Sequence, residues 1–133
     1  MNLKAIITAT AHKVPEKIMT NFDLEKLVDT SDEWIRSRTG IIKRHVVSQN
    51  EATSDISTKI AKSLLKKSGI SAKEIDLIIV GTITPDHFTP STAALVQKNI
   101  GALNAWGFDL SAACSGFLFG LETASNFIKS GNY

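Results

Sequence analysis

The sequence lacks the features that characterise disulfide-bonded, metal-binding, nucleic-acid-binding and membrane proteins. Its 133 residues include one cysteine, so no internal disulfide can form, and three scattered histidines do not complete a metal site with it. Fifteen lysines and arginines face thirteen aspartates and glutamates, a near balance that gives no reason to expect nucleic-acid binding. No apolar run approaches the roughly 20 residues of a membrane helix, and the N-terminal run is too short for a signal peptide. We therefore expect a cytoplasmic protein with no metal and no membrane partner.

The pattern of hydrophobic residues indicates an α/β protein. Hydrophobic residues make up 43% of the chain, enough for the core of one domain or part of one. Short β-branched runs alternate with helical patterns, which is typical of a parallel sheet covered by helices. Strands are predicted over residues 3–9, 76–82 and 105–110, and the second is expected to be central because both its faces are apolar. A charged strand over residues 41–47 would lie at an edge.

Five helices are predicted between and after these strands, from capping residues and terminal glycines. They cover residues 21–28, 31–39, 53–68, 91–100 and 115–129. Asn21 is the expected cap of the first helix and Ser31 the expected cap of the second. The first half of the last helix, GFLFGL, is apolar on all sides, which predicts burial on all sides. Gly116 and Gly120, four residues apart, would let another backbone approach closely.

Cys114 stands in LSAACSGF, where a predicted strand ends and the last helix begins. Small neighbours allow a sharp turn and leave room for a ligand above the sulfur. This arrangement resembles the strand–nucleophile–helix elbow of hydrolases in its logic, although not in its motif. The unpaired N–H groups at a helix N-terminus favour a thiolate and would stabilise a developing oxyanion. A free cysteine is also commonly a small core residue, so its position leaves both a nucleophile and a buried, inert thiol open.

Two further groups of residues could take part in chemistry. A cysteine nucleophile normally needs a base, and the sequence offers no good one, since all three histidines precede Cys114. His87 is the best of the three because it follows the central strand, but a solvated loop residue is the favoured interpretation. Separately, Thr30, Trp34, Arg36 and Arg38 suit a nucleotide, since an indole can stack on a base and guanidinium groups can meet phosphates. The alternative is that Trp34 anchors a short helix while the arginines are solvated.

Three segments together resemble a known family. They are DTSDEWIRSRTGIIKRH (29–45), TPDHFTPSTAALVQKNIG (84–101) and FDLSAACSGFLFGLETASNFIKSG (108–131). They are similar to the N-terminal half of beta-ketoacyl-acyl carrier protein synthase III, the thiolase-superfamily condensing enzyme that initiates type II fatty acid synthesis. The resemblance implies a thiolase-like layered α/β fold, here its N-terminal half only. This half would have a mixed, largely parallel sheet, helices on both faces and a buried nucleophile helix.

The resemblance also implies a reaction and a set of site residues. Cys114 would take the acyl group of a short acyl-CoA, with acetyl-CoA expected, and a decarboxylated malonyl-acyl carrier protein would then attack the acyl-cysteine to give 3-oxoacyl-acyl carrier protein. Trp34 matches the position that stacks on the CoA adenine, Thr30 a neighbouring adenine contact, and Arg38 a position near the nucleotide. Arg36 falls where the family varies and is left out of the site. No cofactor is implied, because the CoA thioester is a substrate.

The resemblance further implies groups outside this chain. Residues 1–133 would be the N-terminal thiolase-like half, incomplete at its C-terminal end at Asn132-Tyr133. The second half would supply the His and Asn that promote decarboxylation, an oxyanion-hole glycine and most of the carrier-protein surface. The full-length enzyme would be a homodimer, with Phe88-Thr89 crossing its interface. Since Thr89 replaces an aromatic residue of many members, the primer chain length stays open.

Three hypotheses follow from this pattern. The chain is part of a working synthase that does not condense by itself, or it is a short, non-catalytic protein that binds CoA or another partner. The third is a thiol hydrolase or peroxidase that uses Cys114 with His87.

Overall fold

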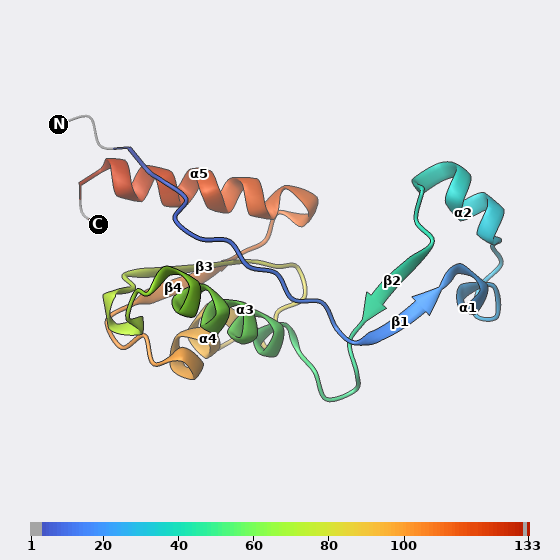
Figure 1. Cartoon of the computed structure of the whole chain (residues 1–133), viewed down its shortest axis with the longest axis horizontal. Coiled ribbons are helices and arrows are strands. Elements are labelled where there is room, and N and C mark those ends of the chain that lie inside the picture. The colour runs from blue at the N-terminus through green and yellow to red at the C-terminus, as the bar shows by residue number, and fades with distance from the viewer. Residues whose placement is uncertain (1–3, 132) are drawn as a thin grey trace. The chain divides into compact units, whose positions relative to one another are not determined.

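The computed structural model describes residues 4–131 and 133, which divide into two compact units (Figure 1). The smaller unit consists of residues 14–51, and the larger unit contains the described residues of 1–13 and 52–133. Each unit contains its own pair of strands.

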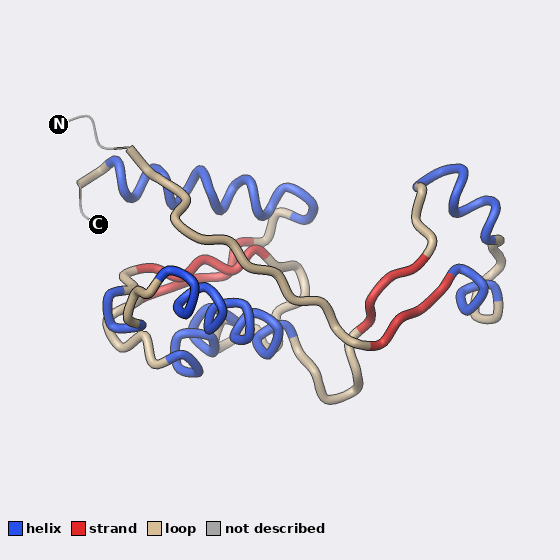
Figure 2. The backbone as a smooth tube through the Cα atoms, in the orientation of Figure 1, coloured by secondary structure: helices blue, strands red, loops and turns tan. Residues whose placement is uncertain are grey.

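The smaller unit is a two-stranded antiparallel ribbon with two short helices (Figure 2). Its elements in chain order are β1 (Lys17–Thr20), α1 (Asn21–Glu25), α2 (Asp32–Thr39) and β2 (Lys43–Val46). The strand expected over residues 41–47 is confirmed as β2, whereas β1 was not predicted. The four residues of β1 contain too little alternation to identify a strand, and their pairing with β2 is what makes them one.

The helices of the smaller unit depend on their caps. Thr20, rather than the predicted Asn21, caps α1: its hydroxyl accepts from the Asp23 N–H at 3.2 Å. The Asp23 carboxylate in turn accepts from the Thr20 hydroxyl at 2.6 Å and the Thr20 N–H at 2.9 Å. The hydroxyl bond is the largest of the effects that lower the pKa of Asp23 from 3.8 to about 2. Helix α2 begins after Ser31, as predicted, and ends at Gly40 with φ +71°.

The larger unit is built around two parallel strands. Strands β3 (Leu77–Gly81) and β4 (Trp106–Leu110) pair in register from Leu77 opposite Trp106 to Gly81 opposite Leu110. Helices α3 (Thr53–Ser68) and α4 (Thr92–Ile100) cover one face, and α5 (Gly116–Lys129) covers the other (Figure 1). Two 3-10 turns, η1 (Ala72–Glu74) and η2 (Ala113–Ser115), complete the unit. The predicted α/β fold with helices on both faces of a parallel sheet is confirmed. The predicted mixed sheet is not formed by the described residues, because the antiparallel pair β1–β2 is a separate sheet of the smaller unit.

Helix α4 contacts the sheet through very small side chains. Ala93 and Val96 are buried. A Cβ on Gly107 of β4 would lie 3.1 Å from the Ala93 Cβ and 2.5 Å from the Ile78 carbonyl oxygen. Only glycine fits at this position, so α4 lies close against β4.

The strand predicted over residues 3–9 is not formed in the described residues. Leu3 lies outside them, and residues 4–10 are extended without pairing, with Ile6 79% and Ile7 67% exposed. A β-branched run becomes a strand only where a neighbour supplies ladder hydrogen bonds, and among the described residues β3 pairs with β4 alone.

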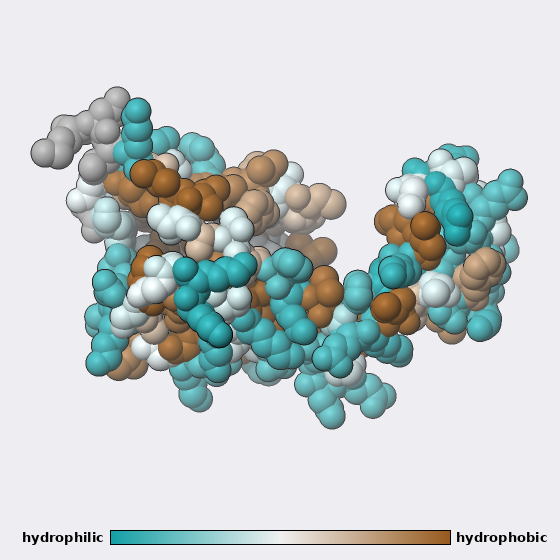
Figure 3. All heavy atoms as spheres, viewed as in Figure 1, coloured by the Kyte–Doolittle hydropathy of each residue, from teal (hydrophilic) through white to brown (hydrophobic). Residues whose placement is uncertain are grey.

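The prediction that GFLFGL is buried on all sides is wrong for this chain. Phe117 is 73%, Leu118 66% and Phe119 56% exposed, and Gly116 is the buried residue of α5. Two strands cover one side of this helix, and no other described helix or strand of the unit covers the rest. Figure 3 shows the resulting hydrophobic surface along α5.

Candidate functional site

Cys114 lies in a sharp turn between β4 and α5. After the strand ends at Leu110, Ala113 adopts φ +44°, in the left-handed region that a residue with a Cβ rarely occupies. Such a backbone costs of order 1–3 kcal/mol and is concentrated at functional sites. The short side chains around Cys114 predict this turn, and the positive φ of Ala113 shows how the chain makes it.

Two glycines bring the start of α5 against the end of β3. The Gly116 backbone packs on Gly81, and a Cβ on Gly81 would lie 3.1 Å from the Gly116 carbonyl carbon. The Thr82 N–H donates to the Leu110 carbonyl at 3.1 Å and ties the ends of the two strands together. The close approach predicted for Gly116 is therefore present, while a Cβ on Gly120 would meet only the Ile79 side chain, at 3.8 Å.

Cys114 is exposed, so it is not the buried core residue of the alternative prediction, while its reactivity stays a prediction. A backbone hydrogen bond from the Ser115 N–H to the Ala112 carbonyl, at 3.0 Å, closes the turn around Cys114. This turn lies at the carboxyl ends of two parallel strands, where α/β sheets bind their ligands. An accessible thiol at the N-terminus of a fourteen-residue helix is suited to nucleophilic attack.

Aspartates that the sequence analysis did not single out hold the neighbouring loops. The Asp109 carboxylate of β4 accepts from the Thr92 and Ala93 N–H groups at 2.7 and 2.8 Å, so it fixes the start of α4. Asp86 accepts from the Ser54 N–H at 2.9 Å and fastens the loop after β3 to the start of α3. His87 follows it in this loop and is exposed. The role of Asp109 could have been predicted from the sequence, because it is the one carboxylate near the end of an otherwise apolar strand.

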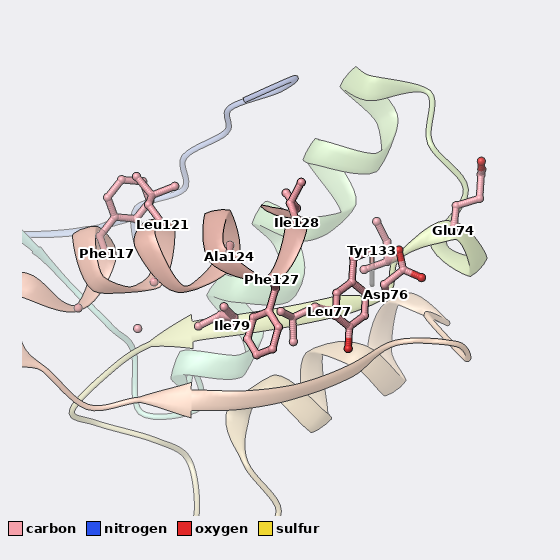
Figure 4. A pocket seen from close by; sticks show the side chains of 14 residues that line it. Glu74, Asp76, Leu77, Ile79, Phe117, Leu121, Ala124, Phe127, Ile128 and Tyr133 are labelled. Carbon is pink, nitrogen blue, oxygen red and sulfur yellow. The ribbon is translucent and has the colours of Figure 1, made fainter. Parts of the chain in front are cut away.

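A groove of about 420 Å³ runs between β3 and α5 (Figure 4). Its lining is largely apolar and includes Phe117, Leu121 and Phe127 of α5 and Leu77 and Ile79 of β3. The groove extends along the sheet from Gly116, two positions after Cys114, toward Tyr133. Within the described residues, no three His, Cys, Asp or Glu side chains come together as a metal site.

The nucleotide-binding residues expected from the sequence lie in the smaller unit. Trp34 on α2 is 56% exposed, and the Arg38 guanidinium carbon lies 5.6 Å from its ring centroid, within cation–π range. Thr30 is half-buried and immediately precedes the Ser31 cap. Arg36 instead pairs with Asp32, Nε to Oδ2 at 3.1 Å. The structure thus joins Trp34 with Arg38 on one helix, while Cys114 belongs to the other unit.

The chain is similar to known sequences over almost its whole length. The family model for 3-oxoacyl-[acyl-carrier-protein] synthase III matches residues 108–133. Beta-ketoacyl-[acyl-carrier-protein] synthase III of Chlorobaculum tepidum is 60% identical over 131 residues, which is 98% of this chain and 40% of that protein. The protein of the same name from Streptococcus mutans is 60% identical over 129 residues, 97% of this chain and 39% of the relative. The chain thus spans about 40% of the length of the curated relatives it matches.

Solved structures agree with this similarity. The crystal structure of 3-oxoacyl-[acyl-carrier-protein] synthase III from Aquifex aeolicus matches with a TM-score of 0.90 and 48% identity, over 97% of this chain and 41% of that one. The Thermus thermophilus structure of the same enzyme matches with a TM-score of 0.82 and 44% identity, over 90% of this chain and 37% of that one.

The fold is therefore that of the thiolase-like condensing enzymes. Within that class, the chain resembles beta-ketoacyl-acyl carrier protein synthase III and fits its N-terminal portion, as the three sequence segments predict. Among the described residues, none of the helices has the length and apolar character to cross a membrane.

Proposed function

We propose that the chain is the acyl-accepting part of a beta-ketoacyl-acyl carrier protein synthase III. In this role Cys114 attacks the thioester carbonyl of a short acyl-CoA, most simply acetyl-CoA. The carbon–sulfur bond to CoA breaks, CoA leaves as its thiol, and the acyl group remains on Cys114. The exposed thiol on the turn between β4 and α5 is the observation that carries the proposal.

The turn suits this chemistry for two reasons. The strained Ala113 backbone directs the chain so that the thiol lies outside the packed sheet. The N-terminal end of α5 contributes a positive dipole end beside the sulfur, which stabilises the negative charge that develops on the thioester oxygen during attack. His87, the candidate base of the alternative thiol-hydrolase hypothesis, is exposed in the loop after β3, and its participation stays a prediction.

We assign the CoA nucleotide to the smaller unit. The exposed indole of Trp34 offers a stacking surface for adenine, and Arg38 adds a cation on the same helix. Thr30, just before the cap of this helix, would contact the base from its edge. The CoA thioester is a substrate, so acyl transfer to Cys114 needs no additional cofactor.

The second half of the reaction draws on groups that the resemblance places beyond residue 133. There, malonyl-acyl carrier protein loses carbon dioxide, and the resulting carbanion attacks the acyl-cysteine to release 3-oxoacyl-acyl carrier protein. We treat residues 1–133 as the N-terminal thiolase-like half of such an enzyme, which would act as a cytoplasmic homodimer in the initiation of fatty acid synthesis. The chain alone is then expected to accept an acyl group without condensing it.

Acylation can be tested directly because Cys114 is the one cysteine of the chain. The purified chain is incubated with acetyl-CoA and analysed by intact-mass spectrometry, with free CoA quantified in parallel. We expect one acetyl group per chain, removable by hydroxylamine, and none on the matched variant C114S. Iodoacetamide treatment before acetyl-CoA should abolish the adduct.

Two other results would separate the remaining hypotheses. CoA binding that weakens in W34A, without any acetylation of Cys114, would contradict the acyl-acceptor role and favour a non-catalytic CoA-binding protein. Hydrolysis of a thioester or reduction of a peroxide that depends on both Cys114 and His87 would favour a different thiol enzyme. H12A serves as the control for H87A, because both histidines are exposed.

A further inference from the structure

Asn21 is the most completely buried polar side chain of the smaller unit, with an exposed fraction of 0%. Its amide makes three hydrogen bonds: Nδ2 donates to Asp32 Oδ1 and to the Ile41 carbonyl, both at 2.8 Å, and Oδ1 accepts from Arg44 Nη2 at 2.7 Å. The guanidinium can only donate, whereas the carboxylate and the carbonyl accept. The partners therefore fix which amide atom is nitrogen and which is oxygen.

The two donated bonds reach the two ends of α2. Asp32 is the first residue of this helix, and Ile41 directly follows Gly40, where the helix ends. One amide group thus holds the start and the end of the eight-residue helix that carries Trp34 and Arg38. Such a short helix is marginal without contacts of this kind.

The third bond anchors Asn21 itself. Arg44 lies on β2, and its guanidinium also donates to the Met19 carbonyl of β1 at 3.4 Å. The Asn21 N–H adds a bond to the Ile42 carbonyl at 3.3 Å. The amide is therefore fixed to the two-stranded ribbon on one side and to both ends of α2 on the other.

We propose that Asn21 is a positioning residue for CoA: its amide clamps both ends of α2 and so holds Trp34 and Arg38 in the arrangement that receives the nucleotide. This role rests on the assignment of the CoA nucleotide to α2 made above. Asn21 acts through the helix and need not touch the ligand. Loss of the clamp lowers the fraction of molecules with α2 in the binding arrangement, and the dissociation constant for CoA rises in inverse proportion.

The test compares variants that differ in hydrogen-bonding pattern more than in size. N21D keeps an acceptor for Arg44 but loses both donors toward α2. N21D/D32N returns one donor, because the new amide at position 32 can donate to the carboxylate at position 21. N21S removes the amide without adding charge and covers the case in which N21D does not fold. T20A is the control, since it breaks the cap of α1 and leaves the Asn21 clamp intact.

Two measurements are made on each full chain: hydrogen exchange of the α2 amides and the CoA dissociation constant by calorimetry. We expect N21D to speed α2 exchange and weaken CoA binding by about tenfold each, N21S to do so by a smaller factor, and T20A to change neither by more than about twofold. Relative to N21D, N21D/D32N should slow α2 exchange and tighten CoA binding by about threefold each. A general loss of stability does not predict this rescue.

Either of two results would overturn the proposal: α2 exchange in N21D and N21S no faster than in T20A, or CoA affinity lowered equally in all four variants. A wild-type chain that does not bind CoA would instead overturn the nucleotide assignment and with it the positioning role. The exchange measurement distinguishes this case from failure of the clamp, because it does not depend on CoA.

Discussion

Replacing Gly81 by alanine tests how the turn that carries Cys114 is held in place. The new Cβ would lie 3.1 Å from the Gly116 carbonyl carbon, 3.3 Å from its oxygen and 3.5 Å from the Phe117 nitrogen. Carbon atoms prefer separations of about 3.5–4.0 Å, so the start of α5 must move by a few tenths of an ångström. All three contacts are with backbone, which cannot rotate away as a side chain can.

The magnitude follows from two opposing effects. Overpacking of this kind costs about 1–3 kcal/mol. The lower entropy of the unfolded chain with alanine returns about 0.4–1 kcal/mol. We therefore expect G81A to lower the free energy of unfolding of the larger unit by about 1–2 kcal/mol, and to slow acetyl transfer to Cys114 by about three- to tenfold through displacement of the turn.

Gly120 provides a matched control on the same helix. Its Cβ would make an ordinary contact of 3.8 Å with the Ile79 side chain. A glycine-to-alanine change within a helix stabilises by about 0.5–1 kcal/mol when nothing obstructs it. G120A should therefore raise the free energy of unfolding and leave the rate of Cys114 acetylation unchanged.

The two tryptophans make the measurement specific. Trp34 lies in the smaller unit and Trp106 in β4, so in a W34F background Trp106 fluorescence reports urea unfolding of the larger unit. With a denaturant slope of about 2 kcal/mol per molar urea, a loss of about 1–2 kcal/mol lowers the midpoint by roughly 0.5–1 M. An unchanged midpoint and an unchanged acetylation rate in G81A, or a lowered midpoint in G120A, would refute the steric reasoning.

Two further predictions concern the cap of α1 and the surface of α5. Carbon-detected NMR should give a pKa of about 2 for Asp23 and a value closer to 3.8 in T20A, because the hydrogen bond from the Thr20 hydroxyl is lost. The stabilisation linked to this depressed pKa is present above about pH 4 and disappears as the pH falls through about 2. A wild-type pKa near 3.8 would contradict the cap. The exposed apolar residues of α5, and the edge of β3 that no other described strand pairs with, should cause the chain to self-associate. Sedimentation velocity should then show smaller species for L118E than for K62E, which changes an exposed residue of α3, and a wild-type chain that stays monomeric at all concentrations would contradict this expectation.

Helices with strong signals at both ends could be predicted from the sequence alone. Helix α2 has Ser31 before it and Gly40 after it, and α4 has Ser91 and Gly101 in the same places. These signals act over a few residues: a side-chain oxygen meets an N–H three positions on, and a glycine takes up positive φ. Since the contacts are local, the order of the residues contains the information needed.

The two strands that were misjudged show where local patterns fail. Residues 4–9 have β-branched residues but no ladder partner among the described residues, whereas β1 has little pattern and becomes a strand through β2. The roles of Gly81 and Asn21 were missed for the same reason. Gly81 meets Gly116, 35 positions later in the chain, and the side-chain partners of Asn21 are 11 to 23 positions away. Such pairings are decided by tertiary structure.

The two proposed parts of the site are held by different kinds of force, and this determines which substitutions each tolerates. The turn with Cys114 is placed by steric contact between two glycines, so it should respond to added volume and be indifferent to hydrogen-bonding capacity. Helix α2 is placed by a buried amide whose donors and acceptor are all used, so it should respond to an exchange of donor for acceptor at nearly constant volume. G81A and N21D therefore form a crossed pair: the first should impair acetylation with little effect on CoA affinity, and the second should weaken CoA affinity with little effect on alkylation of Cys114. If G81A and N21D each lowered CoA affinity and the reactivity of Cys114 to the same extent, the separation of acyl acceptance from nucleotide binding would be wrong.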